Sequence, residues 1–143
     1  MENLPDPVVS FFQAYERNIV AGDTPALLAQ FADPFLFAGP QGTKIVSATD
    51  HAKALPGRRE LFQRHGHQSS SLADFHPIPL SSRYVLVLTK WRMTFAGAAS
   101  QPREIVVDSA FIVDAGAETQ KIIVYLASED IVEMLKNFEI AAA

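Results

Sequence analysis

The chain has 143 residues, a length typical of one domain, and we predict that residues 1–143 form one. Hydrophobic residues make up 48% of it and charged residues 20%, which excludes intrinsic disorder and predicts a sizeable core. The net charge of −4 gives no electrostatic reason to bind nucleic acid or an acidic membrane surface. Without cysteine, the chain can form neither a disulfide nor a thiolate site.

Two helices are predicted at the N-terminal end. Residues 7–21 carry apolar side chains at the spacing of one helical face, which predicts a helix that Asp6 caps and Gly22 ends. Thr24 then predicts the cap of a second, short helix from residue 25 to about residue 32.

The next elements, after a break at Asp33–Pro34, are short. They are a strand at 35–38, a turn at 39–42 and a returning strand at 44–48. Pro56 and Gly57 favour irregular structure for residues 49–57. A third helix is therefore predicted only from residue 58 to about residue 65.

The second half of the chain predicts mostly strands. They are expected at residues 69–76, 84–95, 104–113 and 121–127. Pro77 and Pro79 require the first of these to be an edge strand or to contain a bulge. Alternation through the second places Trp91 on an apolar face, which should point inward. Ser128 predicts the cap of a last helix, from residue 129 to about residue 138.

The order of these elements predicts the fold class. Helices followed by long strands indicate α+β, with the helices packed on one face of an antiparallel sheet. We predict a curved antiparallel sheet wrapped round the N-terminal helices as a cone. The open end of a cone is a natural pocket for a small molecule.

Several segments resemble a known superfamily. The run Ala21-Gly22-Asp23, the following stretch 27–33 and the strands at 107–116 and 121–125 resemble the nuclear transport factor 2-like superfamily, in its SnoaL-like and ketosteroid-isomerase-like branches. The resemblance covers nearly the whole chain in element order and implies a cystatin-like α+β barrel. Because this fold carries isomerases, cyclases, dehydratases, transport factors and binding modules, it leaves the function open.

The resemblance also implies candidate catalytic residues. In ketosteroid isomerases a tyrosine and a protonated aspartic acid stabilise an oxyanion, and a second aspartate moves the proton. Tyr15, six residues before Ala21, and Asp108, after Val107, match the first two positions. Gly39 stands where the proton-transferring base is expected, so that base is missing.

The residues themselves leave alternatives open for this pair. Asp108 lies in an apolar strand, and burial would raise its pKa if it points inward next to Tyr15. It could equally pair with Lys90 or Arg92 on the adjacent strand. Tyr15 could be a core aromatic residue whose hydroxyl lies at the rim.

Other side chains are candidates for a ligand-binding wall. They are Phe37, Trp91, Met93, Tyr125 and His76. No histidine spacing matches a metal site, and no phosphate-binding loop or nucleophile motif is present, so we expect neither a metal nor a cofactor. The sequence start lacks a signal-peptide pattern and the apolar runs are too short to span a bilayer, so we expect a cytoplasmic protein that does not enter membranes.

Three functions are compatible with these features. The missing base at Gly39 favours a domain that binds a small hydrophobic, oxygen-bearing ligand. An isomerase, cyclase or dehydratase that uses Tyr15 and Asp108 would need His76 or Asp33 as its base. A dimeric accessory domain with a vestigial pocket is the third. In each case a homodimer is expected through the outer sheet face, at Leu86 and Leu88.

Overall fold

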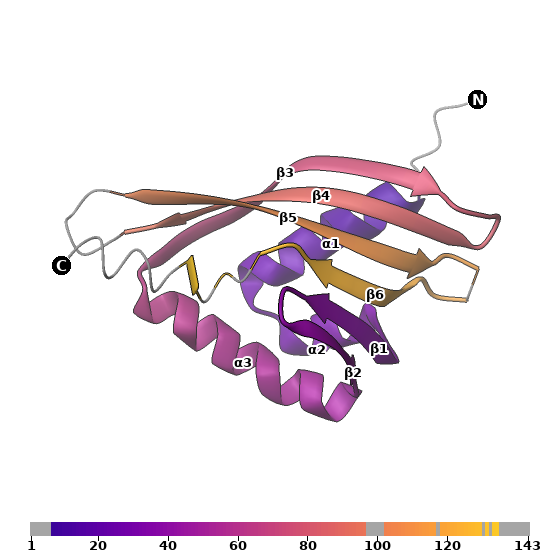
Figure 1. Cartoon of the computed structure of the whole chain (residues 1–143), viewed down its shortest axis with the longest axis horizontal. Helices are drawn as coiled ribbons and strands as arrows, with labels where there is room; N and C mark the ends of the chain where they lie inside the picture. The colour runs from indigo at the N-terminus through magenta and orange to yellow at the C-terminus, as the bar shows by residue number, and fades with distance from the viewer. Residues whose placement is uncertain (1–6, 97–101, 117, 130, 132, 135–143) are drawn as a thin grey trace.

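The computed structural model describes residues 7–96, 102–116, 118–129, 131, 133 and 134. The described chain forms three helices and six strands, and Figure 1 shows their arrangement. Their bounds are α1 Pro7–Ala21, α2 Thr24–Ala29, β1 Phe31–Gly39, β2 Gly42–Val46, α3 Ala48–Arg64, β3 His67–Pro79, β4 Tyr84–Phe95, β5 Arg103–Asp114 and β6 Lys121–Ala127.

The six strands form one curved sheet in the order β2-β1-β6-β5-β4-β3. Neighbouring strands are antiparallel except β1 and β6, which run parallel. β2 and β3 are the two edges, so the sheet is open and does not close into a barrel. The predicted α+β class and curved sheet are confirmed, and the parallel pair is the one departure from an antiparallel arrangement.

Helix α1 fills one half of the concave face of this sheet (Figure 1). Phe12 is the centre of its contact and is only 1% exposed. Its ring centroid lies 5.4 Å from that of Phe75 on β3 and 5.1 Å from that of Phe111 on β5. Burial of large aromatic side chains is the main favourable term in such packing, so α1 anchors the sheet. Its predicted bounds are confirmed; the predicted cap, Asp6, lies outside the described residues.

Two predicted details of the α2 region are wrong. The helix is capped by Asp23, whose Oδ1 accepts a hydrogen bond from the Ala26 N–H at 3.1 Å, and Thr24 is already helical. The helix also ends at Ala29, because Phe31 begins β1 and pairs with Ile122 of β6. The Asp33–Pro34 pair therefore lies inside a strand, at an irregularity in the β1–β6 register where proline is tolerated.

The predicted start of the third helix is also wrong, by a larger margin. Helix α3 begins at Ala48 and continues through Pro56 and Gly57, where irregular structure was expected. Two polar side chains cap its first turn. The Ser47 hydroxyl accepts a hydrogen bond from the Asp50 N–H at 3.1 Å, and Asp33 Oδ1 accepts one from the Ala48 N–H at 2.9 Å. Caps and tertiary packing together outweigh the local cost of a proline inside the helix.

The long strands agree with their predicted positions. β3 carries both prolines and is an edge strand with two irregularities in its register. In β4, Trp91, Met93 and Phe95 are buried on the inner face, as the alternation indicates. Of the last predicted helix, residues 131, 133 and 134 are helical and most of the rest lies outside the described residues. None of the helices described here is both long and apolar enough to cross a bilayer.

The turn after α1 joins it to α3. Gly22 has φ of +65°, a left-handed conformation that ends α1, as predicted. The Arg59 guanidinium of α3 donates to the carbonyls of Ala21 and Gly22, each at 3.3 Å. These bonds satisfy carbonyl groups at the helix end and place a cation at its negative pole.

The Gly22→Ala variant tests this junction. We expect it to lose about 1–2 kcal/mol of unfolding free energy in urea, because an L side chain is strained at this φ. Its Cβ would also overlap the Arg59 guanidinium. Gly57→Ala is the matched control: it lies in α3 with open space around it, so it should gain about 0.5–1 kcal/mol. A Gly22→Ala protein as stable as the wild type would contradict this account of the turn.

Candidate functional site

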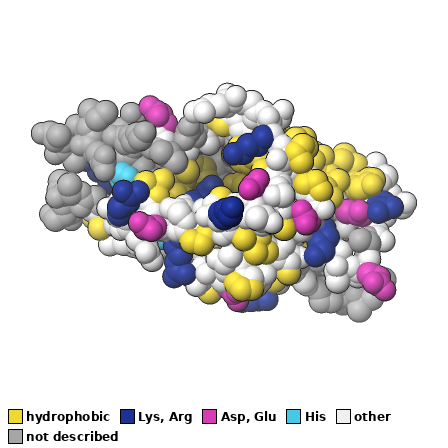
Figure 2. Space-filling view, turned by 90° about the horizontal axis from the view of Figure 1, so that it is seen from below, with side chains coloured by type: hydrophobic (Ala, Val, Ile, Leu, Met, Phe, Trp, Pro, Cys, Tyr) yellow, Lys and Arg dark blue, Asp and Glu magenta, His cyan; other side chains and the backbone are white. Residues whose placement is uncertain are grey.

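A cavity lies between α3 and the inner face of the sheet. α3 packs against α2 and against the flanking strands β1 and β3, and so crosses the concave face without filling it. The cavity opens to the surface and has a volume of about 790 Å³. Figure 2, which views the molecule from below, shows a hollow bordered by hydrophobic and by basic side chains. The turn between β1 and β2, together with the strand residues on either side of it (residues 39–44), borders it as well.

Aromatic side chains form the sheet side of this cavity. We call them the aromatic wall; they are Phe31, Phe35, Phe37, Phe111 and Tyr125. The rings of Phe111 and Tyr125, on adjacent strands, are stacked at 4.9 Å with 14° between their planes. Phe37 meets Tyr125 edge-on at 5.6 Å. The rings brace one another and present a preformed apolar surface.

Four of the predicted ligand-binding residues line the cavity, namely Phe37, Trp91, Met93 and Tyr125. Trp91 offers only its ring to the cavity, because its Nε1–H donates to Thr89 Oγ1 at 3.1 Å. Thr89 Oγ1 is in turn 2.8 Å from Ser109 Oγ and 3.1 Å from the Ser109 carbonyl. This buried network satisfies its own polar groups and leaves the indole nitrogen with no role toward a ligand.

Tyr15 reaches the same cavity from α1. It is buried, with ring contacts to Trp91 at 5.9 Å and to Phe111 at 5.6 Å. Burial, and next the neighbouring Tyr125, raise the pKa of Tyr15 well above its ordinary value, while the positive charge of Arg58 opposes this rise. Tyr15 is therefore protonated at neutral pH and can donate a hydrogen bond.

The expectation that Asp108 lies inside beside Tyr15 is wrong. Asp108 borders the rim of the cavity, but its side chain is 61% exposed, and its carboxylate pairs with Lys90 Nζ at 2.8 Å. The neighbouring Val107 and Ser109 take the inner face, so strand alternation turns Asp108 outward. The Tyr15–Asp108 pair is therefore not assembled.

No replacement base appears at the other predicted positions. His76 is exposed on β3, opposite Leu88 of the outer face, and does not line the cavity. Asp33 caps the first turn of α3. Gly39 lies at the cavity mouth, where an added Cβ would stand 2.9 Å from the Phe37 ring.

Two cavity residues on α3, His51 and Arg58, were missed by the sequence analysis. His51 is buried against Phe31 and Phe35, with ring centroids 4.6 and 4.9 Å apart, and burial lowers its pKa. It is neutral at pH 7 for that reason. The spacing of residues 51, 55, 58 and 62 marks one helical face and could have revealed both, had the segment not been assigned as irregular.

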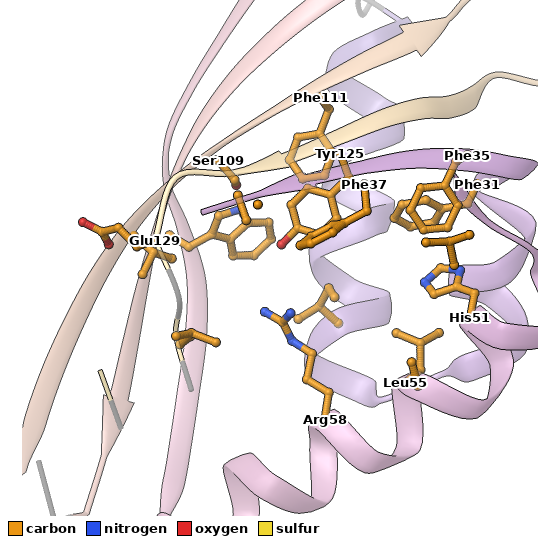
Figure 3. Close-up of a pocket in the computed structure, with 18 of the residues that line it drawn as sticks. Phe31, Phe35, Phe37, His51, Leu55, Arg58, Ser109, Phe111, Tyr125 and Glu129 are labelled. Atoms are coloured by element: carbon orange, nitrogen blue, oxygen red, sulfur yellow. The ribbon is translucent and has the colours of Figure 1, made fainter. Parts of the chain in front are cut away.

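The site thus combines an aromatic surface with a few polar groups. Arg58 from α3 and Tyr125 from β6 point toward the same space (Figure 3), and Tyr15 lines it from α1. Among the described residues, no cluster of three histidine or acidic side chains could hold a metal ion. The arrangement can enclose an apolar body and donate hydrogen bonds or a positive charge to an oxygen atom.

Comparison with known proteins gives the fold and no more. Neither a family model nor a curated protein matches the sequence. Among solved structures, it is similar to a nuclear transport factor 2-like protein from Cytophaga hutchinsonii, with a TM-score of 0.66, 13% identity and coverage of 90% of this chain and 100% of the other. A ketosteroid isomerase-like protein from Erwinia carotovora atroseptica matches with a TM-score of 0.62, 15% identity and coverage of 85% and 89%.

A third similar structure is the beta subunit of the benzoate 1,2-dioxygenase from Burkholderia mallei, with a TM-score of 0.65, 13% identity and coverage of 92% and 99%. These neighbours carry different functions on one architecture. Identities this low establish the fold alone. The chain therefore has the cystatin-like α+β fold of nuclear transport factor 2-like proteins, as its sequence resemblance implied.

Proposed function

We propose that the protein binds a small, largely apolar molecule carrying an oxygen atom in the cavity between α3 and the sheet. The observation that carries the proposal is the preformed aromatic wall around a space of about 790 Å³. Ligand sites of roughly 300–1,000 Å³ are typically apolar with a few convergent polar groups. Tyr15, Arg58 and Tyr125 supply such groups here.

The described residues favour binding without turnover. The position implied for a base is Gly39, and the carboxylate of Asp108 is on the outer face. A catalytic alternative, an isomerase, cyclase or dehydratase, would instead use the Tyr15 hydroxyl as donor and the neutral His51 imidazole as proton acceptor. The observation that supports this alternative is that His51 lines the cavity with a neutral ring, although burial also makes that ring a weaker base.

We further propose that the protein is a homodimer, joined through an outer apolar patch on β4, β5 and β6. The patch consists of Leu86, Leu88, Ile112, Val124 and Leu126. Leu88 and Leu126 are 42% and 43% exposed, large fractions for leucine side chains on a sheet face. Beside the patch, Lys90 pairs with Asp108 and Arg92 with Glu104, so two copies could approach without a strong net charge between them.

Ligand binding can be followed through Trp91, because the chain has one tryptophan and it lines the cavity. We expect 2-decalone, a neutral bicyclic ketone, to shift the emission of Trp91 in a saturable way. Val107→Phe, which fills the cavity from β5, should weaken this binding at least tenfold. Val106→Phe is the matched control on the outer face of the same strand and should bind as the wild type does. Saturable binding that Val107→Phe leaves unchanged would show that the ligand lies elsewhere.

The dimer is tested by the Leu126→Glu variant. Wild-type protein at micromolar concentration should scatter light as a particle of twice the 15.7 kDa chain mass. The variant should give the single-chain mass, because a charge cannot be buried unpaired in an apolar contact. Ile45→Glu, at a 66% exposed position on β2, is the control and should remain dimeric. A wild-type mass of 15.7 kDa would refute the dimer.

A further inference from the structure

The cavity contains a cation without a described counter-ion. The Arg58 side chain extends from α3 toward the aromatic wall (Figure 3), with its Cζ 5.1 Å from the Phe62 ring centroid. Among the residues that the structure describes, no acidic side chain forms an ion pair with it. Arg58 is exposed to solvent, so the apolar walls strengthen its attraction for an anion only when the bound molecule itself excludes water from the guanidinium.

The acidic side chains that border the cavity do not pair with Arg58. The Asp108 carboxylate is bound to Lys90 on the outer face. The Glu129 side chain points away from Arg58 (Figure 3), and it adds a small effect to that of Asp108, which is the main cause of the raised pKa of Lys90. Lys44, at the mouth, adds a second positive charge. Four described charged side chains thus line the cavity, two basic and two acidic, and of the two labelled in Figure 3 only Arg58 is directed toward the aromatic wall.

The Arg58 guanidinium and the Tyr15 hydroxyl act on the same space. The charge of Arg58 lowers the pKa of Tyr15 against the larger effect of burial, so the two groups lie within electrostatic reach of each other. A guanidinium presents a planar pair of N–H donors that matches the two oxygens of a carboxylate. The protonated Tyr15 adds another donor, and the aromatic wall faces Arg58 from the sheet side.

We propose that the cavity selects organic acids: aromatic or alicyclic monocarboxylates whose carboxylate pairs with Arg58 and accepts a hydrogen bond from Tyr15. The ring of the acid lies against the aromatic wall. This inference rests on the proposed ligand-binding function and names the class of ligand for that site. A monoanion matches a single guanidinium, whereas a neutral analogue of the same shape leaves that cation without a partner.

The test compares 2-naphthoate with 2-naphthamide, which has the same shape and no charge, by isothermal titration calorimetry. We expect wild-type protein to bind 2-naphthoate at least tenfold more tightly. Arg58→Gln should reduce this preference to less than twofold while still binding the amide. Arg64→Gln removes an equal charge from the last turn of the same helix, outside the cavity lining, and should keep the full preference.

The outcomes separate this inference from the function on which it rests. Equal affinity for the two compounds, or no binding of 2-naphthoate by a protein that binds 2-decalone, overturns the selectivity for acids and leaves the binding function standing. Failure to bind any of the three compounds overturns both. The wild-type preference is measured without mutation, so the inference stays testable even if Arg58→Gln does not fold. A preference that Arg58→Gln retains in full also contradicts it.

Discussion

The structure depends on one constraint: α3 is held across the concave face of the sheet without collapsing onto it. Ser47 and Asp33 cap its start, and Arg59 ties its middle to the C-terminal end of α1. α2 and the flanking strands support it on either side. Because α1 already fills the other half of the concave face, the space under α3 remains open. The cavity is thus a consequence of how one helix is anchored, and His51 and Arg58 reach it because they share the inner face of that helix.

The polar groups around the cavity fall into two kinds. Trp91, Thr89 and Ser109 satisfy one another and belong to the wall, so they fix its shape. The Tyr15 hydroxyl and the Arg58 guanidinium have no such closed network among the described residues, and they are available to a bound molecule. Groups of the first kind make the surface rigid, and those of the second give it chemical selectivity. The separation explains why a predicted ligand residue such as Trp91 contributes shape while the unpredicted Arg58 contributes charge.

The sequence predicts the fold well where one physical signal dominates. Alternation alone gives the bounds and the inward face of β4, and the apolar spacing gives α1. The first half of α3 is not predicted, because Pro56 and Gly57 are strong local helix breakers. The polar cap from Asp33 that helps to offset them comes from a strand distant in the sequence. No local pattern can report a cap supplied by another element.

The face of Asp108 shows a different limit. Both faces of β5 carry apolar residues, so periodicity groups Asp108 with Val106 and Ile112 without telling which group is buried. The outer group is apolar where the proposed dimer contact lies, and the inner group includes the buried Ser109. The register settles the matter, because Lys90 stands directly opposite Asp108 and the two form an ion pair. The resemblance to ketosteroid isomerases implied that Asp108 faces inward, whereas its ion pair with Lys90 holds it on the outer face.

The central claim is that the protein binds a small apolar molecule between α3 and the sheet. Intermolecular NOEs from bound 2-decalone to the methyl groups of the protein test this claim most directly. The account predicts NOEs to Leu55, Met93 and Val107, which line the cavity from three different elements. It predicts none to Leu88 or Leu126 on the outer face. NOEs confined to those two leucines would place the molecule on the outer apolar patch and contradict the account.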